Sequence, residues 1–233
     1  MTASARDGVA VVIPVLNERA ALPLVVAEIP RECVDRIVVV DNGSTDGTRE
    51  IAAALPVEVV VEPRRGYGSA CLAGAAALRD APPKILVFLD GDHSDRPEEL
   101  PLLLQAIASG ADVVIGSRTL GRREPGALLP QARFGNALAC GLMRLLTGHR
   151  YTDLGPFRAL RWEAYESLAM ADRGFGWTCE MQMKAARRGL RIAEVPVSYR
   201  RRIGVSKITG TVSGTVRAGA KILSTIARYG LRG

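Results

Sequence analysis

The sequence predicts a single α/β domain with a mostly parallel sheet and helices on both faces of the sheet. In its first half, apolar runs of strand length alternate with segments of helix length, as right-handed crossovers between parallel strands require. Turn sequences rich in Gly, Asn and Asp separate these segments. The chain has 233 residues and is 48% hydrophobic, which suits one sizeable core.

The first half of the chain contains four expected strands and the helices that connect them. The strands are continuous apolar runs, typical of buried parallel strands, at residues 9–14, 37–41, 57–62 and 85–89. Helices are expected at 22–29, with Asn17 as the candidate N-cap, at 48–55, at 66–79 and from about Pro97. Because parallel strands end at the same edge of a sheet, Pro14, Asp41 and Asp90 should lie together there.

The most informative stretch follows the fourth strand, where Asp90 and Asp92 stand one residue apart. Two carboxylates at the end of a buried strand suit a hard cation, Mg²⁺ or Mn²⁺, that would offset the charge of a diphosphate. The alternative is a solvated acidic loop that only caps the following helix, with Ser94 or Asp95 as the N-cap. The stretches before it in the chain favour the cation site.

Three stretches resemble, in order and in spacing, the nucleotide-sugar half of family 2 inverting glycosyltransferases with the GT-A fold. They are Val12-Ile-Pro-Val-Leu-Asn-Glu18, Val40-Asp-Asn-Gly-Ser-Thr-Asp-Gly-Thr48 and Phe88-Leu-Asp-Gly-Asp92. The resemblance implies that the nucleoside pocket is lined by Pro14, Asn17, Glu18 and Asp41. It also implies that Asp90 and Asp92 hold the metal ion on a UDP- or GDP-linked sugar. Asn42 departs from the family pattern, in which many members carry a second aspartate.

The second half of the chain continues with a strand, two amphipathic helices and an edge strand. The expected elements are a strand over 111–118, helices over 128–146 and 176–188, an alternating edge strand over 190–200 and a closing helix over 208–229. In the helix over 128–146 one side is apolar, with Leu128, Phe134, Leu138, Leu142, Leu145 and Leu146. Packing against the sheet and lying in a membrane interface both explain this pattern, the second with Arg133 reaching a lipid phosphate. The same two explanations apply to the closing helix over 208–229: it could pack against the core or lie on the surface of an anionic membrane.

Further motifs resemble the polyprenyl-phosphate hexosyltransferases within this family. The Gly-Ser-Arg that ends at Arg118 implies an arginine near phosphate, and the stretch 152–159 implies that Asp153 and Arg158 serve the sugar or acceptor site. That stretch has Gly155-Pro156 where the family pattern has Ser-Gly. Late in the chain, the resemblance implies phosphate contacts from Arg202, Ser206 and Lys207.

Glu180 opens the helix over 176–188 and is the obvious general base if one is needed. A phosphate monoester, however, is already ionised near neutral pH, since its second pKa is about 6. An acceptor of that kind could attack without a base. We therefore assign Glu180 to the donor-sugar hydroxyls or to orientation, with a helix cap or a buried ion pair as the alternative.

The net charge of +7 is concentrated at the end of the chain. From Arg187 onward there are eleven Lys and Arg and one acid, Glu194, so this part carries +10 and the rest −3. A basic region of this kind implies an anionic partner: phosphates, a membrane surface or nucleic acid. The four scattered cysteines suit reduced, mostly buried thiols of a cytosolic protein. No signal peptide or membrane-spanning stretch is visible, which predicts a peripheral protein on the cytoplasmic face of the membrane.

The resemblance, together with these observations, implies a metal-dependent inverting glycosyltransferase that moves a hexose, mannose or glucose, from a nucleoside diphosphate sugar to a polyprenyl phosphate. Its parts would be a nucleotide-sugar half at 1–120, an acceptor half at 121–207 and a basic amphipathic helix at 208–233. The catalytic group would comprise Asp92, Arg118, Arg202 and Lys207. The alternatives are a related enzyme with a soluble phosphorylated acceptor and a nucleic-acid-binding module. The last would leave unexplained why carboxylates stand at the strand ends.

Overall fold

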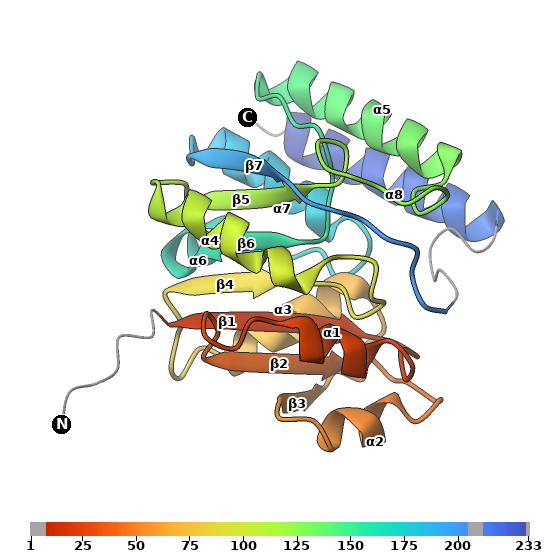
Figure 1. Ribbon diagram of the computed structural model, residues 1–233. Helices are drawn as coiled ribbons and strands as arrows, with labels where there is room; N and C mark the ends of the chain where they lie inside the picture. The colour runs from red at the N-terminus through yellow and green to blue at the C-terminus, as the bar shows by residue number, and fades with distance from the viewer. Residues whose placement is uncertain (1–7, 205–211, 232–233) are drawn as a thin grey trace.

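The computed structural model describes residues 8–204 and 212–231 (Figure 1). Seven strands form one sheet in the order β3-β2-β1-β4-β6-β5-β7, in which only β6 runs antiparallel to its neighbours. The strands are β1 (Val9–Val15), β2 (Arg36–Asp41), β3 (Glu58–Val61), β4 (Ile85–Phe88), β5 (Val113–Ser117), β6 (Arg158–Arg161) and β7 (Ile192–Pro196). The helices are α1 (Leu22–Glu28), α2 (Thr48–Ala53), α3 (Tyr67–Ala77), the 3₁₀ turn η1 (Pro97–Glu99), α4 (Leu100–Ala108), α5 (Pro130–Thr147), α6 (Trp162–Leu168), α7 (Trp177–Arg187) and α8 (Val212–Leu231).

The predicted mostly parallel α/β fold is confirmed, with β7 at the edge of the sheet as expected. Two elements, β6 and α6, were not foreseen from the sequence. The strand β6 is only four residues long and has an arginine at each end, so it shows no apolar run. It is nevertheless buried between β4 and β5, because Arg158 is hydrogen-bonded inside the protein. The strand β6 could not be recognised from an apolar pattern, because a buried arginine stands at its start.

Helices cover both faces of the sheet, and alternate residues of β1 show how the two cores divide. Val11 and Ile13 pack on the face covered by α1 and α4, whereas Ala10 and Val12 pack on the face covered by α3, α6 and α7. The β1 side chains on both faces are almost completely buried. Each of the Val and Ile side chains contributes about 1.5–3 kcal/mol by leaving water. This double-sided core fixes the sheet that carries the site.

Helices α5 and α8 lie beside each other outside α7, at the β5–β7 end of the molecule (Figure 1). Their contact with the domain is a small cluster to which α5 contributes Ala139, Cys140 and Met143 and α8 contributes Ile226. Only part of the apolar side of α5 packs inward, through Leu142 and Leu146. Phe134 and Leu145 are 72% and 79% exposed. Packing against the domain therefore does not explain the exposed part of this apolar side.

Local details at the functional edge differ from the expected helix caps. Residue Ala21, not Asn17, precedes α1, and neither Ser94 nor Asp95 caps a helix, because Arg96 precedes η1. Gly91 separates the two acids after β4, and a Cβ atom there would lie 2.6 Å from Val15 Cγ1. Only glycine therefore fits between these acids without a shift of the Val15 side chain. Within the residues described, no helix combines the length and apolar character needed to cross a membrane.

Candidate active site

The two acids that follow β4 lie where the parallel strands end, which is where ligands bind in α/β sheets. Asp92 is 5% exposed, and its Oδ1 accepts hydrogen bonds from the backbone N–H and the hydroxyl of Ser94. Its Oδ2 lies 2.8 Å from Nη1 of Arg202, which follows β7. The structure thus brings together an acid and a basic residue that are 110 positions apart in the sequence.

Asp90 is less well partnered than Asp92 within the described residues. Its Oδ1 is buried and makes no hydrogen bond within the described part of the chain. Burial, and next the negative charge of Asp92, raise the pKa of Asp90 to about 6. Asp95 is also buried, and burial together with the charges of Asp90 and Asp92 raises its pKa well above the usual value. Such a group of acids is stabilised by a cation.

The donor set at this position fits Mg²⁺ or Mn²⁺. Carboxylate oxygens are the ligands these ions prefer, and one or two carboxylates with substrate phosphate oxygens and water complete their shell. Asp95 does not extend the set to three: among the described residues, no cluster of three His, Cys, Asp or Glu side chains could hold an ion. Asp90 and Asp92 are therefore the candidate ligands.

The end of β2 is organised differently. Asp41 is fully buried, and its Oδ2 accepts hydrogen bonds from Nε and Nη2 of Arg49 at 2.9 and 2.7 Å. Burial alone would raise the pKa of Asp41, but hydrogen bonds with Ser44 and Arg49 lower it below its usual value. The neighbouring Asn42 donates to the carbonyls of Glu62 and Arg64 and so ties β2 to the loop after β3. The departure from aspartate at position 42 thus has a structural use.

The turn after β1 carries the other residues expected at the nucleoside pocket. Pro14 is half-buried in β1 beside β2. Asn17 has a positive φ of 55°, and its Oδ1 accepts the backbone N–H of Thr45 at 2.8 Å. Glu18 is 9% exposed, and its backbone N–H donates to Thr48 Oγ1. The turns after β1 and β2 therefore support each other at the edge that carries Asp90.

At the end of β5, Arg118 is engaged by another predicted site residue. Its Nε and Nη2 bind the two carboxylate oxygens of Asp153 at 2.8 and 2.7 Å, and Asp153 is fully buried. The guanidinium also lies over the ring of Tyr199, 5.0 Å from the centroid. Arg118 and Asp153 thus form a bidentate ion pair beside the acids after β4.

Two further candidates lie inside the protein rather than on an accessible surface. Arg158 is fully buried, and its guanidinium donates to the carbonyl oxygens of Gly155, Thr178 and Leu154 and to Gln182 Oε1. The Glu180 carboxylate is also fully buried and has four partners: the backbone N–H groups of Ala171 and Asp172, the Tyr229 hydroxyl and Lys184 Nζ. Both side chains are saturated by the protein.

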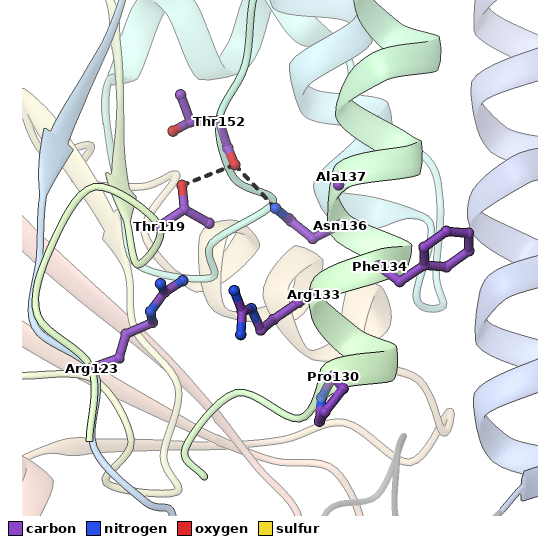
Figure 2. A pocket seen from close by; sticks show the side chains of 8 residues that line it. All are labelled: Thr119, Arg123, Pro130, Arg133, Phe134, Asn136, Ala137 and Thr152. Atoms are coloured by element: carbon purple, nitrogen blue, oxygen red, sulfur yellow. Dashed lines mark hydrogen bonds between the residues drawn. The ribbon is translucent and has the colours of Figure 1, made fainter. Parts of the chain in front are cut away.

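Arg133 lies in a pocket of about 490 Å³ between the loop after β5 and the start of α5. Figure 2 shows the guanidinium groups of Arg133 and Arg123 directed toward each other, on the side of α5 away from Phe134. Asn136 and Thr119 both donate to the carbonyl of Thr152 and fix the wall of the pocket. Two exposed arginines that face each other suit a phosphate group.

Sequence analysis missed three residues of this region and named two that lie outside the described residues. Asp95 was considered only as a helix cap, although its place three residues after Asp92 in an acid-rich turn was a usable signal. Tyr199, which forms a backbone bridge with Asp95, and Arg123 carried no pattern of their own. Ser206 and Lys207 fall within 205–211 and remain expectations from the sequence.

Comparison with known proteins agrees with this geometry. The model of the family described as glycosyl transferase family 2 matches residues 10–168. An uncharacterized glycosyltransferase of Mycobacterium tuberculosis is 42% identical over 220 residues, which are 92% of this chain and 95% of that protein. The polyprenol monophosphomannose synthase of Mycolicibacterium smegmatis is 35% identical over 96% of this chain and 87% of its own length.

Among solved structures, glucosyl-3-phosphoglycerate synthase from Mycobacterium tuberculosis in complex with Mn²⁺, uridine diphosphate and phosphoglyceric acid shares the fold. Its TM-score is 0.76 at 22% identity, over 97% of this chain and 79% of that one. The GT-A fold and the family resemblance expected from the sequence are both confirmed. The match to the family model, with relatives above 30% identity along nearly the whole chain, shows that this protein belongs to glycosyl transferase family 2 and is a glycosyltransferase.

Proposed function

We propose that the protein transfers a hexose, mannose or glucose, from a UDP- or GDP-linked donor to the phosphate of a polyprenyl phosphate at the cytoplasmic membrane face. The observation that carries this proposal is the pocket of Arg123 and Arg133, which opens at the start of a helix with an exposed apolar side. A polyprenyl phosphate has the same two parts, an anionic head and a long apolar chain. The pocket and the helix would bind one part each.

The exposed apolar side of α5 consists of Phe134, Leu138 and Leu145, which fall on one stripe of the helix. Their exposed fractions are 72%, 43% and 79%, which is unusual for three large apolar side chains in one line. Arg133 and Arg144, eleven residues apart, lie together on another side of the helix and are exposed. A basic helix with such a stripe suits the interface of an anionic membrane. These features support a peripheral membrane location.

The chemistry at the donor site follows from the residues at the strand ends. Asp90 and Asp92 would hold the Mg²⁺ or Mn²⁺ ion, and a bound ion supplies charge neutralisation to the departing diphosphate. Arg202, which contacts Asp92 Oδ2, is placed to add a second positive charge on the same side. Arg118 forms an ion pair with Asp153. Its positive charge also favours the ionised form of Asp90.

The reaction needs no proton acceptor on the protein. An ionised oxygen of the acceptor phosphate attacks the anomeric carbon of the hexose and forms the new C–O bond. The bond between that carbon and the diphosphate oxygen breaks, and its electron pair leaves with the diphosphate, so configuration inverts. Because Glu180 is saturated by four donors, the structure favours this route over general-base catalysis by Glu180.

The relatives support the proposal and also define its main rival. The Mycolicibacterium smegmatis relative is named a polyprenol monophosphomannose synthase. The structural neighbour is described with phosphoglyceric acid, and a pair of arginines would bind any phosphomonoester. A soluble phosphorylated acceptor is therefore the second candidate. Nucleic-acid binding gains no support, because family membership accounts for the basic side chains through phosphates of donor and acceptor.

The decisive experiment incubates the full chain and Mn²⁺ with UDP- and GDP-linked mannose and glucose and either a short polyprenyl phosphate or phosphoglyceric acid. Products are identified by mass. We expect glycosyl polyprenyl phosphate from one donor. Product with phosphoglyceric acid alone would establish the soluble-acceptor enzyme instead, and donor hydrolysis without transfer to either acceptor would contradict both.

Membrane association is tested separately with vesicles that contain anionic phospholipid, at low salt. The variant Phe134→Ser/Leu145→Ser should partition to vesicles at least about tenfold more weakly, since each side chain loses about 1.5–3 kcal/mol of burial. Leu24→Ser on α1 is the matched control, because Leu24 is also exposed (44%) but lies on a different helix. Equal partitioning of all three proteins would remove the apolar stripe from the proposal.

A further inference from the structure

We propose that Glu28, His93 and Arg200 are positioning residues that hold the turn with Asp90 and Asp92 in the geometry that binds the metal ion. This inference rests on the ion site proposed above and assigns a role to three residues that contact neither acid's carboxylate. They come from three distant segments: the end of α1, the turn after β4 and the segment after β7. We call them the turn clamp.

The first observation is the backbone of His93, the residue directly after Asp92. Its φ is +64°, in the left-handed region that residues other than glycine adopt at a cost of about 1–3 kcal/mol. Such a conformation persists only where neighbouring contacts hold it. At His93 the contact is with Glu28, whose Oε1 lies 2.9 Å from the imidazole Nε2. The His93 side chain is 13% exposed.

Arg200 completes the clamp by binding both other members. Its Nη1 lies 3.1 Å from Glu28 Oε1, its Nη2 binds Glu28 Oε2, and its Nε donates to the carbonyl oxygen of His93. Its backbone N–H donates to the carbonyl oxygen of Ser94 at 2.9 Å. The Arg200 side chain is 9% exposed, so this contact is not a solvated surface ion pair.

The clamp acts on the acids through the backbone of the turn. Next to it, the N–H of Ile203 donates to the carbonyl oxygen of Asp92 at 3.0 Å. The turn is thus fixed on one side by the segment 200–203 and on the other by Glu28 at the end of α1. Although burial alone would raise the pKa of Glu28, hydrogen bonds with Arg200 and His93 lower it, so the anchor stays ionised. Asp90 and Asp92 are held in place without a contact to the clamp side chains.

The expected consequence is a change in ion affinity rather than in donor or acceptor contacts. Residues that orient metal ligands without touching the ion typically weaken metal binding 10–100-fold when they are removed. We therefore expect Glu28→Ala and His93→Ala each to weaken Mn²⁺ binding about tenfold. Because they act as one unit, the double variant should be no weaker than either single variant, which a double-mutant cycle measures.

The test titrates Mn²⁺ into the full chain without nucleotide and follows the electron paramagnetic resonance signal of free Mn²⁺. His93→Gly separates the two roles of His93, because glycine adopts a positive φ freely but cannot reach Glu28. We expect His93→Gly to bind Mn²⁺ as weakly as His93→Ala. Restoration of wild-type affinity in His93→Gly would contradict the clamp, since only backbone conformation would then matter.

A control and a reference variant make every outcome decisive. Glu58→Ala breaks another bidentate pair, Arg36–Glu58, on the β2–β3 side of the sheet, and should leave Mn²⁺ affinity unchanged. Asp92→Asn should lose Mn²⁺ binding; if it does not, the proposed ion site itself fails. If Asp92→Asn loses the ion while the clamp variants stay within twofold of wild type, only the clamp is refuted. Glu28→Gln, which preserves shape, replaces Glu28→Ala if that variant does not fold.

Discussion

The ends of β2 and β4 lie on either side of β1 and look alike in sequence, because each apolar run is followed by an acid. In the structure the two acids behave in opposite ways. The pKa of Asp41 is lowered, whereas the pKa of Asp90 is raised to about 6. The two carboxylates are at the same edge of the same sheet, so position alone does not decide their chemistry.

The difference lies in the partners that the chain provides. Asp41 has Arg49 and Ser44, which stabilise its charged form inside the protein. Asp90 has instead a second acid, Asp92, two residues away. The charge of Asp41 is offset by its partners, whereas Asp90, whose Oδ1 accepts no hydrogen bond from the described residues, has a raised pKa that an added cation would lower. Asp153 and Glu180 are each paired with a basic side chain and so resemble Asp41.

The largest expected effect is on turnover by Asp92→Asn. The amide keeps the shape but lacks the charge that holds the ion, so we expect a loss of about 10³-fold, which corresponds to about 4 kcal/mol. Steady-state rates with the donor identified above measure it, and circular dichroism checks the fold. Asp112→Asn is the control, because Asp112 pairs with Arg191 just before β5, at the opposite end of that strand from Arg118. Undiminished turnover in Asp92→Asn would place the ion elsewhere.

The next largest effect should come from removing the basic partner of Asp41, so that its pKa rises as that of Asp90 does. Arg49→Met removes its cation and leaves a buried carboxylate with hydrogen bonds from Ser44 alone. We expect the free energy of unfolding at pH 7 to fall by about 2 kcal/mol. The pKa of Asp41 should rise, so part of the loss should be recovered as the pH is lowered and the acid takes up a proton. Urea denaturation at several pH values measures both, and an unchanged stability would contradict the comparison.

Asp41→Asn should have a smaller effect with a definite pH dependence. The folded-state pKa of Asp41 is lower than the ordinary value of 3.8, so its charge stabilises the fold above that pH. We expect a deficit of about 1 kcal/mol against wild type at neutral pH. The deficit should shrink as the pH falls below 3.8 and through the lower folded value, because wild type then loses the same contribution. A deficit that grows at low pH would have the wrong sign.

The fold, and the places of Asp90 and Asp92 within it, were predictable because their signals are local. Continuous apolar runs give buried strands, and motifs such as 40–48 and 88–92 sit in the turns that follow them. Asp90 and Asp92 follow β4, as the spacing predicts. The predicted helix cap at Asn17 was wrong. The Asn17 side chain accepts a hydrogen bond from the turn after β2 instead of from the start of α1.

The surroundings of Arg118, Asp153 and α5 were less predictable because their contacts are not local. Arg118 is 35 residues from its partner Asp153, and no sequence pattern indicates that the two form an ion pair. The apolar side of α5 was visible in the sequence, but amphipathicity does not tell which side faces the core. Here the inward side carries Asn136, Ala139 and Met143, while three large apolar residues, Phe134, Leu138 and Leu145, are exposed.

The smallest expected effect, on turnover by Glu180→Gln, bears most directly on the reaction. Glu180 has four donors, so its carboxylate is a structural acid of the Asp41 kind. The substitution should lower the free energy of unfolding by about 1–2 kcal/mol, while the turnover rate per folded molecule stays within about threefold of wild type. If turnover instead fell by about two orders of magnitude or more, and the pH profile lost its basic group, Glu180 would be the general base. An acceptor that needs a base carries a hydroxyl nucleophile, so that result would also exclude the phosphate acceptor proposed here.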